Sequence, residues 1–81
     1  MEQKIFNLGL SIDGTSLYLI LAALQSEDKP LTMENIKPRW LAPEEKLTES
    51  ITELKAHQVI STIGENFILR PATEWQKTKH S

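Results

Sequence analysis

Apolar residues in the first half of the chain recur at helical spacing. They predict a first helix that ends near Gln25, because a polar stretch follows there. Its inward stripe consists of Leu17, Ile20, Leu21 and Leu24. The opposite side is also apolar and carries Leu19, Ala22 and Ala23. A helix that is apolar all round has to be covered all round, so we expect other elements or a partner to surround it.

Two more helices are predicted downstream. Thr32 suits the N-cap of a short second helix, which Pro38 ends or kinks. Pro43 suits the first position of a third helix that continues to His57. The inward-facing positions of these two helices are Met33, Ile36, Leu47, Ile51, Leu54 and Gln58. Trp40 lies between the two helices and is expected to fill their junction as a core residue.

The third helix leads directly into a predicted β-hairpin. Its strands are Val59 to Ile63 and Phe67 to Arg70, joined by the turn Gly64-Glu65-Asn66. A third short strand near Pro30 to Thr32 would pair at the edge of this sheet. The pattern therefore predicts an α+β, mainly helical domain over residues 15–70.

Two flanking segments are predicted outside this domain. Residues 1–14 alternate apolar residues with polar ones or glycine, which indicates an extended arm or edge strand. The apolar positions of the arm are Phe6, Leu8, Leu10 and Ile12. Such an arm either folds back over the first helix of its own chain or leaves that helix to a second protomer. Residues 71–81 contain one large apolar residue, Trp75, and are predicted to form a mostly frayed polar tail.

The order of these elements resembles the winged helix-turn-helix superfamily of small bacterial regulators. Three segments carry the resemblance: Leu31 to Ile36, Pro43 to Leu47, and Leu54 to Ile60. Family members often have glycine where His57 or Gln58 stands in this chain. The resemblance implies three helices followed by a C-terminal hairpin, the wing. It also implies a third helix that lies in the major groove of DNA, with the wing against neighbouring backbone.

The charge pattern opposes strong nucleic-acid affinity. Nine basic and eleven acidic residues give a formal charge of -2, which provides no overall field to attract a polyanion. The outward face of the third helix carries Glu45, Glu49, Thr52, Glu53 and Ala56. Contacts to DNA would have to come from Lys37, Arg39, Lys46, Thr52, Lys55 and Arg70. The resemblance therefore implies a DNA-binding transcriptional regulator whose affinity for double-stranded DNA is weak and salt-dependent.

The alternative is a winged-helix module that binds another protein. The acidic face formed by Glu45, Glu49 and Glu53 suits a basic partner, and Trp75 has the character of an interface anchor. Packing of Trp75 on the body of the same chain is the other interpretation of this residue. The apolar first helix leaves both a homodimer and a monomer open.

No enzymatic, metal or cofactor function is predicted. The chain has no cysteine, which removes disulfides and thiolate ligands together. His57 and His80 have no second ligand at metal spacing, and no serine or glycine motif indicates a nucleophile or a phosphate site. The N-terminus lacks a secretory signal pattern, and the longest apolar stretch, Leu17 to Leu24, is too short to cross a bilayer. We therefore expect a cytoplasmic protein without membrane association.

Overall fold

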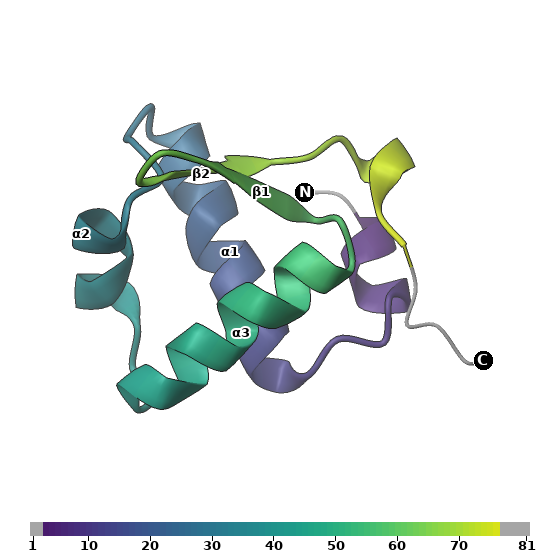
Figure 1. The fold of residues 1–81 in the computed structure, drawn as a ribbon, viewed down its shortest axis with the longest axis horizontal. Coiled ribbons are helices and arrows are strands. Elements are labelled where there is room, and N and C mark those ends of the chain that lie inside the picture. The colour runs from purple at the N-terminus through teal and green to yellow at the C-terminus, as the bar shows by residue number, and fades with distance from the viewer. Residues whose placement is uncertain (1–2, 77–81) are drawn as a thin grey trace.

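Three α-helices precede a two-stranded antiparallel hairpin in the computed structural model, which describes residues 3–76 (Figure 1). The helices are α1 (Ile12–Ser26), α2 (Met33–Ile36) and α3 (Glu44–Ala56), and the strands are β1 (Ile60–Ile63) and β2 (Asn66–Leu69). Short 3-10 helices occupy Gln3–Asn7, Lys37–Arg39 and Ala72–Glu74. This order confirms the predicted fold class and is consistent with the winged-helix layout.

The core lies between α3 and α1, which crosses behind it in Figure 1. The hairpin packs against the same core through Ile60, Phe67 and Leu69. Of the predicted inward stripe of α1, three residues are fully buried: Leu17, Leu21 and Leu24. Ile36, Leu47 and Leu54 bring the other two helices into the same core. Burial of these aliphatic side chains contributes roughly 1.5–3 kcal/mol each, so the spacing of apolar residues largely determines the fold.

The hairpin forms where it was predicted, but Asn66 belongs to β2 rather than to the turn, and a third segment joins the sheet. Ile60 pairs with Leu69 and Ile63 with Asn66. Gly64 stands in the turn with φ +59°, a conformation that glycine adopts without strain. Thr32 forms an antiparallel bridge with Asn66, and the Phe67 amide donates to the Leu31 carbonyl at 2.7 Å. The predicted edge strand is therefore confirmed as a short bridge, which ties the start of α2 to β2.

The end of α3 differs from the predicted stripe at one position. Gln58 is exposed and has φ +62°, the left-handed conformation that commonly ends a helix. Its predicted inward orientation is wrong because the chain has already left the helix, and Val59 is buried in its place. Gln58 thus occupies a position of the kind for which glycine is favoured.

The N-terminal segment is helical rather than an extended arm. Residues Gln3–Asn7 form a 3-10 turn, which buries Ile5 and Leu8 and leaves Phe6 exposed. The buried pair is spaced i, i+3, so helical periodicity replaces the predicted alternation. The helix α1 then begins at Ile12, within the predicted arm, because the Ser11 hydroxyl accepts from the Gly14 amide at 3.0 Å and caps it.

The C-terminal segment up to residue 76 is part of the folded body. The Trp75 side chain is only 7% exposed and packs edge-on against Tyr18, with ring centroids 5.4 Å apart. Its indole Nε1 donates to the Arg70 carbonyl at 2.9 Å, and the Gln76 amide donates to the His57 carbonyl at 2.7 Å. The prediction of a frayed tail is therefore wrong for residues 71–76, while residues 77–81 lie outside the described part.

Candidate functional site

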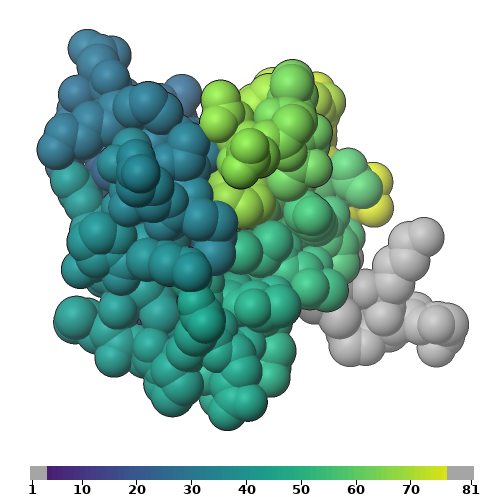
Figure 2. Space-filling view, turned by 60° about the vertical axis from the view of Figure 1, so that its left-hand side comes forward, coloured from purple at the N-terminus to yellow at the C-terminus, as the bar shows by residue number. Residues whose placement is uncertain are grey.

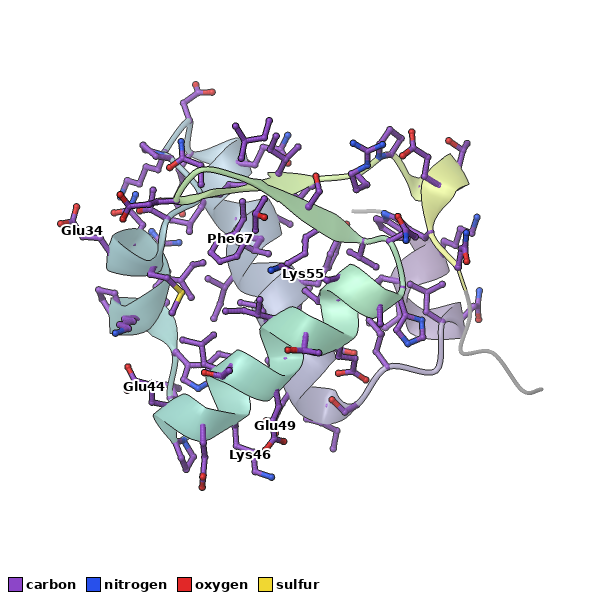
Figure 3. The ribbon with its side chains drawn as sticks, in the orientation of Figure 1. Glu34, Glu44, Lys46, Glu49, Lys55 and Phe67 are labelled. Carbon is purple, nitrogen blue, oxygen red and sulfur yellow. The ribbon has the colours of Figure 1, made fainter. Side chains whose placement is uncertain are left out.

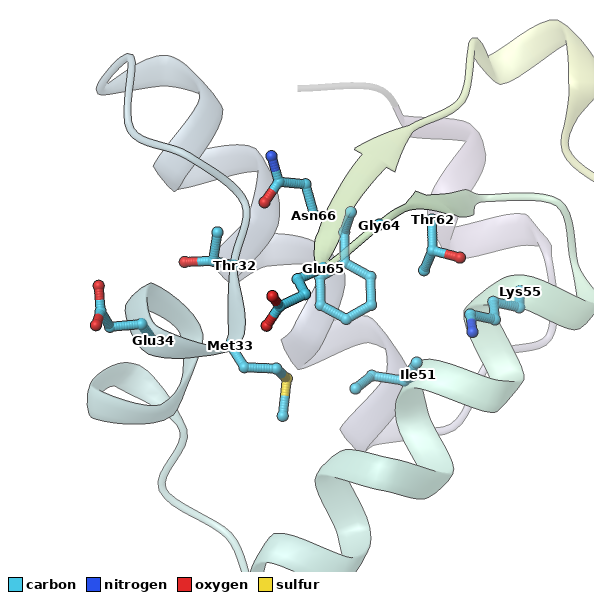
Figure 4. Close-up of a pocket in the computed structure, with 10 residues that line it drawn as sticks. Thr32, Met33, Glu34, Ile51, Lys55, Thr62, Gly64, Glu65 and Asn66 are labelled. Carbon is cyan, nitrogen blue, oxygen red and sulfur yellow. The ribbon is translucent and has the colours of Figure 1, made fainter.

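An open groove of about 700 Å³ lies between the start of α2, helix α3 and the hairpin (Figure 4). Its floor is apolar and consists of the half-buried side chains Met33, Ile51 and Phe67. Its rim carries the exposed charged residues Glu34, Glu65 and Lys55. Glu65 and Lys55 project toward the groove from opposite sides, whereas Glu34 points outward from α2 (Figure 4). We call the space that these six residues line the groove.

Contacts of Thr32 fix two walls of the groove, α2 and the hairpin, relative to each other. The Thr32 hydroxyl caps α2 by accepting from the Asn35 amide at 3.3 Å, and the same residue bridges to Asn66. This places the first turn of α2 beside the hairpin turn, so Glu34 and Glu65 belong to one end of the groove. The view from the α2 side shows the hairpin standing beside α2 with α3 below them (Figure 2). The floor lies where these elements meet.

The outward face of α3 is acidic over its first half. Glu45 and Glu49 are exposed, as predicted, and Glu49 lies 3.7 Å from Lys46 (Figure 3). Thr52 is exposed too, and its hydroxyl donates to the Thr48 carbonyl at 3.2 Å. Two carboxylates and a threonine therefore face the solvent where a DNA-reading helix would present its contacts.

Glu53 does not belong to this outward face. Its carboxylate accepts from the Ser11 amide at 2.8 Å and from the Ser11 hydroxyl at 2.7 Å. Gly14 makes this approach feasible, because a Cβ atom there would collide with the Glu53 carboxylate. The predicted outward orientation of Glu53 is thus wrong: its carboxylate fastens α3 to the N-terminus of α1, where the helix dipole favours a negative charge.

Most of the predicted DNA-contacting cations are paired with carboxylates. Lys37 lies 2.8 Å from Glu44, and the Arg39 guanidinium donates to both oxygens of Glu27 at 2.7 and 3.0 Å. Lys46 lies near Glu49, and Arg70 pairs with Glu74. Within residues 3–76, Lys55 alone of the five predicted cations has no ion pair. The structure does not gather these residues into one basic surface.

Exposed ion pairs of this kind are cheap to break, at roughly 0–1 kcal/mol each, so pairing alone does not prevent a lysine from reaching a phosphate. The neighbouring carboxylate is the larger obstacle. It stays close to any phosphate that its partner would bind, and its repulsion offsets the attraction. The local charge around Lys37, Arg39, Lys46 and Arg70 therefore remains close to neutral.

The strongest electrostatic effect at these pairs is on Glu27. Hydrogen bonds from Arg39 and then Lys29 lower the pKa of Glu27 from 4.5 to about 2. The pKa of Glu44 is lowered in the same way by Lys37. Both pairs lie at the surface and link the 3-10 helix Lys37–Arg39 to the end of α1 and to the start of α3.

Replacing Arg39 with alanine is expected to raise the pKa of Glu27 toward 4.5, with Lys29 retaining part of the lowering. Because the pKa is depressed in the folded state, the stabilising contribution of this carboxylate is present above pH 4.5 and is lost as the pH falls to about 2. A carbon-detected NMR titration of the side-chain carboxyl measures the shift. Lys37→Ala is the control, since it should raise the pKa of Glu44 and leave Glu27 unchanged.

Trp75 is not available as a partner anchor, because it is buried against Tyr18. Trp40 is half-buried and donates from Nε1 to the Pro43 carbonyl at 3.1 Å, so its predicted role at the junction of two helices holds in part. Of the six groove residues, only Lys55 was predicted to belong to a functional site. One feature of the sequence could have indicated the groove: the edge strand predicted near Pro30 to Thr32 implies that the hairpin lies beside the start of α2.

Two further properties of the described residues bear on function. Residues 3–76 contain no group of three or more histidine, aspartate or glutamate side chains placed to hold a metal ion. In the same range, no helix has the length and apolar character needed to cross a membrane. Comparison of the chain with protein-family models, with curated proteins and with solved structures finds no match.

Proposed function

We propose that this protein is a winged-helix-like interaction module that binds a basic, partly apolar segment of another protein in the groove. The observation that carries the proposal is the composition of the groove. Met33, Ile51 and Phe67 offer an apolar floor, Glu65 projects its carboxylate toward the groove, and Glu34 adds a second carboxylate on the outer rim at the same end. A segment with an apolar side chain for the floor and a lysine or arginine for this end complements it.

The acidic face of α3 extends the same preference. Glu45 and Glu49 are exposed on the helix that forms one wall of the groove, so a basic partner meets negative charge beyond the groove itself. The net charge of -2 acts in the same direction at longer range. Lys55 at the opposite rim suits an acidic group or a backbone carbonyl of the bound segment. This contact would fix the direction in which the segment lies in the groove.

Weak, salt-dependent binding to double-stranded DNA by a small regulator is the second candidate. The observation that favours it is the placement of the hairpin beside α3, the arrangement with which winged helices hold a duplex. Lys55 on α3 would then contact a phosphate. The acidic neighbours of the other cations are the reason for placing this function second.

A selection from a random-peptide display library on the immobilised full chain tests the first candidate. We expect enrichment of sequences in which lysine or arginine lies within a few residues of a leucine, methionine or aromatic residue. Enrichment of acidic sequences, or no enrichment at all in a selection that succeeds on a control protein, would contradict the proposal.

Met33→Glu is expected to weaken the selected peptides at least about tenfold, because it removes an apolar contact worth roughly 1.5–3 kcal/mol and adds a charge to the floor. Ile63→Glu is the matched control: Ile63 is 66% exposed in the hairpin and does not line the groove. Titration calorimetry with one selected peptide compares the two variants. Equal weakening by both would place the binding site elsewhere.

A further inference from the structure

A second apolar surface lies on a side of α1 that residues 3–76 leave exposed. Among residues 3–76, three of the five exposed large hydrophobic side chains belong to it: Ile12, Leu19 and Leu41, exposed at 86%, 36% and 97%. Ile12 and Leu19 lie seven residues apart along α1 and therefore share one face of the helix. We call these three residues and the hollow beside them the α1 surface.

The hollow of the α1 surface has a volume of about 310 Å³. Leu19, Ile20 and Trp40 give it apolar walls, and Asp13 and Arg39 add one charge of each sign. The hydrogen bond from Trp40 Nε1 to the Pro43 carbonyl holds the indole in place. Leu41 follows directly in the chain and extends almost entirely into solvent. Leu41 also lines one edge of the hollow, so a protruding apolar side chain and an apolar recess adjoin on one surface.

We infer that the α1 surface binds a second copy of this chain about a twofold axis, with Leu41 of each copy seated in the hollow of the other. A twofold interface uses the same patch on both partners, so the patch must be complementary to itself. The α1 surface meets this requirement in shape, because it holds both the protruding side chain and an apolar recess.

The charges of the hollow meet the same requirement. In the inferred arrangement, Asp13 of one copy faces Arg39 of the other, and the twofold axis repeats this pair. Arg39 has five N–H donors and uses two of them on Glu27, so donors remain for a partner's carboxylate. Because Glu27 neutralises much of the charge of Arg39, this contact acts at short range as a directed hydrogen bond. Because the surface carries one acidic and one basic residue, a partner that is only basic or only acidic would complement one of them and repel the other. A second copy supplies the opposite charge at both positions.

The size of the chain also favours self-association. A stable interface needs roughly 800 Å² from each partner, which is about 15% of the 5367 Å² surface of this domain. A domain this small has a thin core and gains from covering an apolar face. No residue lines both the groove and the hollow of the α1 surface. The dimer is therefore independent of the proposed peptide binding and leaves the groove of each copy open.

Sedimentation velocity of the full chain, from about 1 to about 300 µM, tests the inference in a range that covers micromolar dissociation constants. The wild type should sediment as a dimer at the upper concentrations. Leu41→Glu should be monomeric throughout while keeping the wild-type circular dichroism spectrum. Ile63→Glu, which places the same charge on an exposed isoleucine of the hairpin, should dimerise like the wild type. A monomeric wild type, or a dimer that Ile63→Glu abolishes and Leu41→Glu does not, overturns the inference.

Exchange of the two charges tests the twofold geometry itself. Asp13→Lys alone opposes two cations in each half of the interface, and Arg39→Glu alone opposes two anions, so each variant should be monomeric. Mixed in equal amounts, they should form a heterodimer. The introduced lysine of the first variant then faces the introduced glutamate of the second, while the unchanged arginine and aspartate remain paired. Failure of the mixture to dimerise, with both variants folded and the wild type dimeric, rules out this arrangement.

Discussion

Replacing Trp75 with alanine is expected to lower the free energy of unfolding by about 3–5 kcal/mol, the usual cost of truncating a buried tryptophan. A domain of this length has roughly 4–12 kcal/mol in total, so the variant should lose at least about a quarter of its stability and, at the lower end of this range, should be unfolded. The reason is that Trp75 covers Tyr18 on α1 and holds the chain after Arg70 through its indole hydrogen bond. Urea denaturation followed by circular dichroism measures the loss.

Trp75→Phe separates the ring from its hydrogen bond. The variant keeps an aromatic side chain against Tyr18 but leaves the Arg70 carbonyl without the indole donor, so we expect a loss of about 1–2 kcal/mol. If Trp75 served instead as an exposed anchor for a partner, the free energies of unfolding of both variants would lie within about 0.5 kcal/mol of the wild-type value, as they do for surface substitutions. That outcome would contradict the packing of the C-terminal segment against α1.

Local signals account for the elements that the sequence predicted correctly. Thr32 caps α2, Pro43 precedes α3, and Gly64 stands in the hairpin turn, and each acts through residues no more than a few positions away. The two ends of the chain lack such local signals. Ile5 and Leu8 are buried by tertiary packing, and the Lys4 ammonium donates to the Ala72 carbonyl at 2.9 Å, across almost the whole length of the chain. Periodicity cannot anticipate contacts of that separation.

The candidate site was predictable only in part, for the same reason. Helical spacing placed Glu45, Glu49 and Glu53 on one side of α3, and this holds for the first two. For Glu53 the spacing could not reveal that Ser11, 42 residues earlier, would stand against that side of the helix. The pairing of Arg39 with Glu27 likewise joins the C-terminal end of α1 to the 3-10 helix that follows α2. The sequence therefore predicted which charged residues share a helix face, whereas the residues that they pair with depend on the tertiary fold.

Replacing Glu45 and Glu49 together with glutamine is expected to tighten binding to double-stranded DNA. Each removed carboxylate that would lie about 4 Å from a phosphate relieves about 1 kcal/mol of repulsion in water, which corresponds to about fivefold in affinity. Lys46 is also released from its pair with Glu49 and becomes available to the duplex. Two replacements should therefore tighten binding by more than tenfold. Glu53 is left unchanged, because its carboxylate caps α1.

A fluorescence titration of a labelled mixed-sequence duplex at low salt measures this effect, with Glu34→Gln as a control that removes one charge away from α3. The slope of the logarithm of the binding constant against the logarithm of the salt concentration should become more negative by about 0.9, the contribution of one phosphate contact, as Lys46 becomes available. If the wild type does not bind and the double variant does, the acidic face of α3 excludes nucleic acid, as the proposed protein-binding function requires. Tight wild-type binding that the double replacement leaves unchanged would mean that DNA is held by another surface, and the second candidate function would then take precedence.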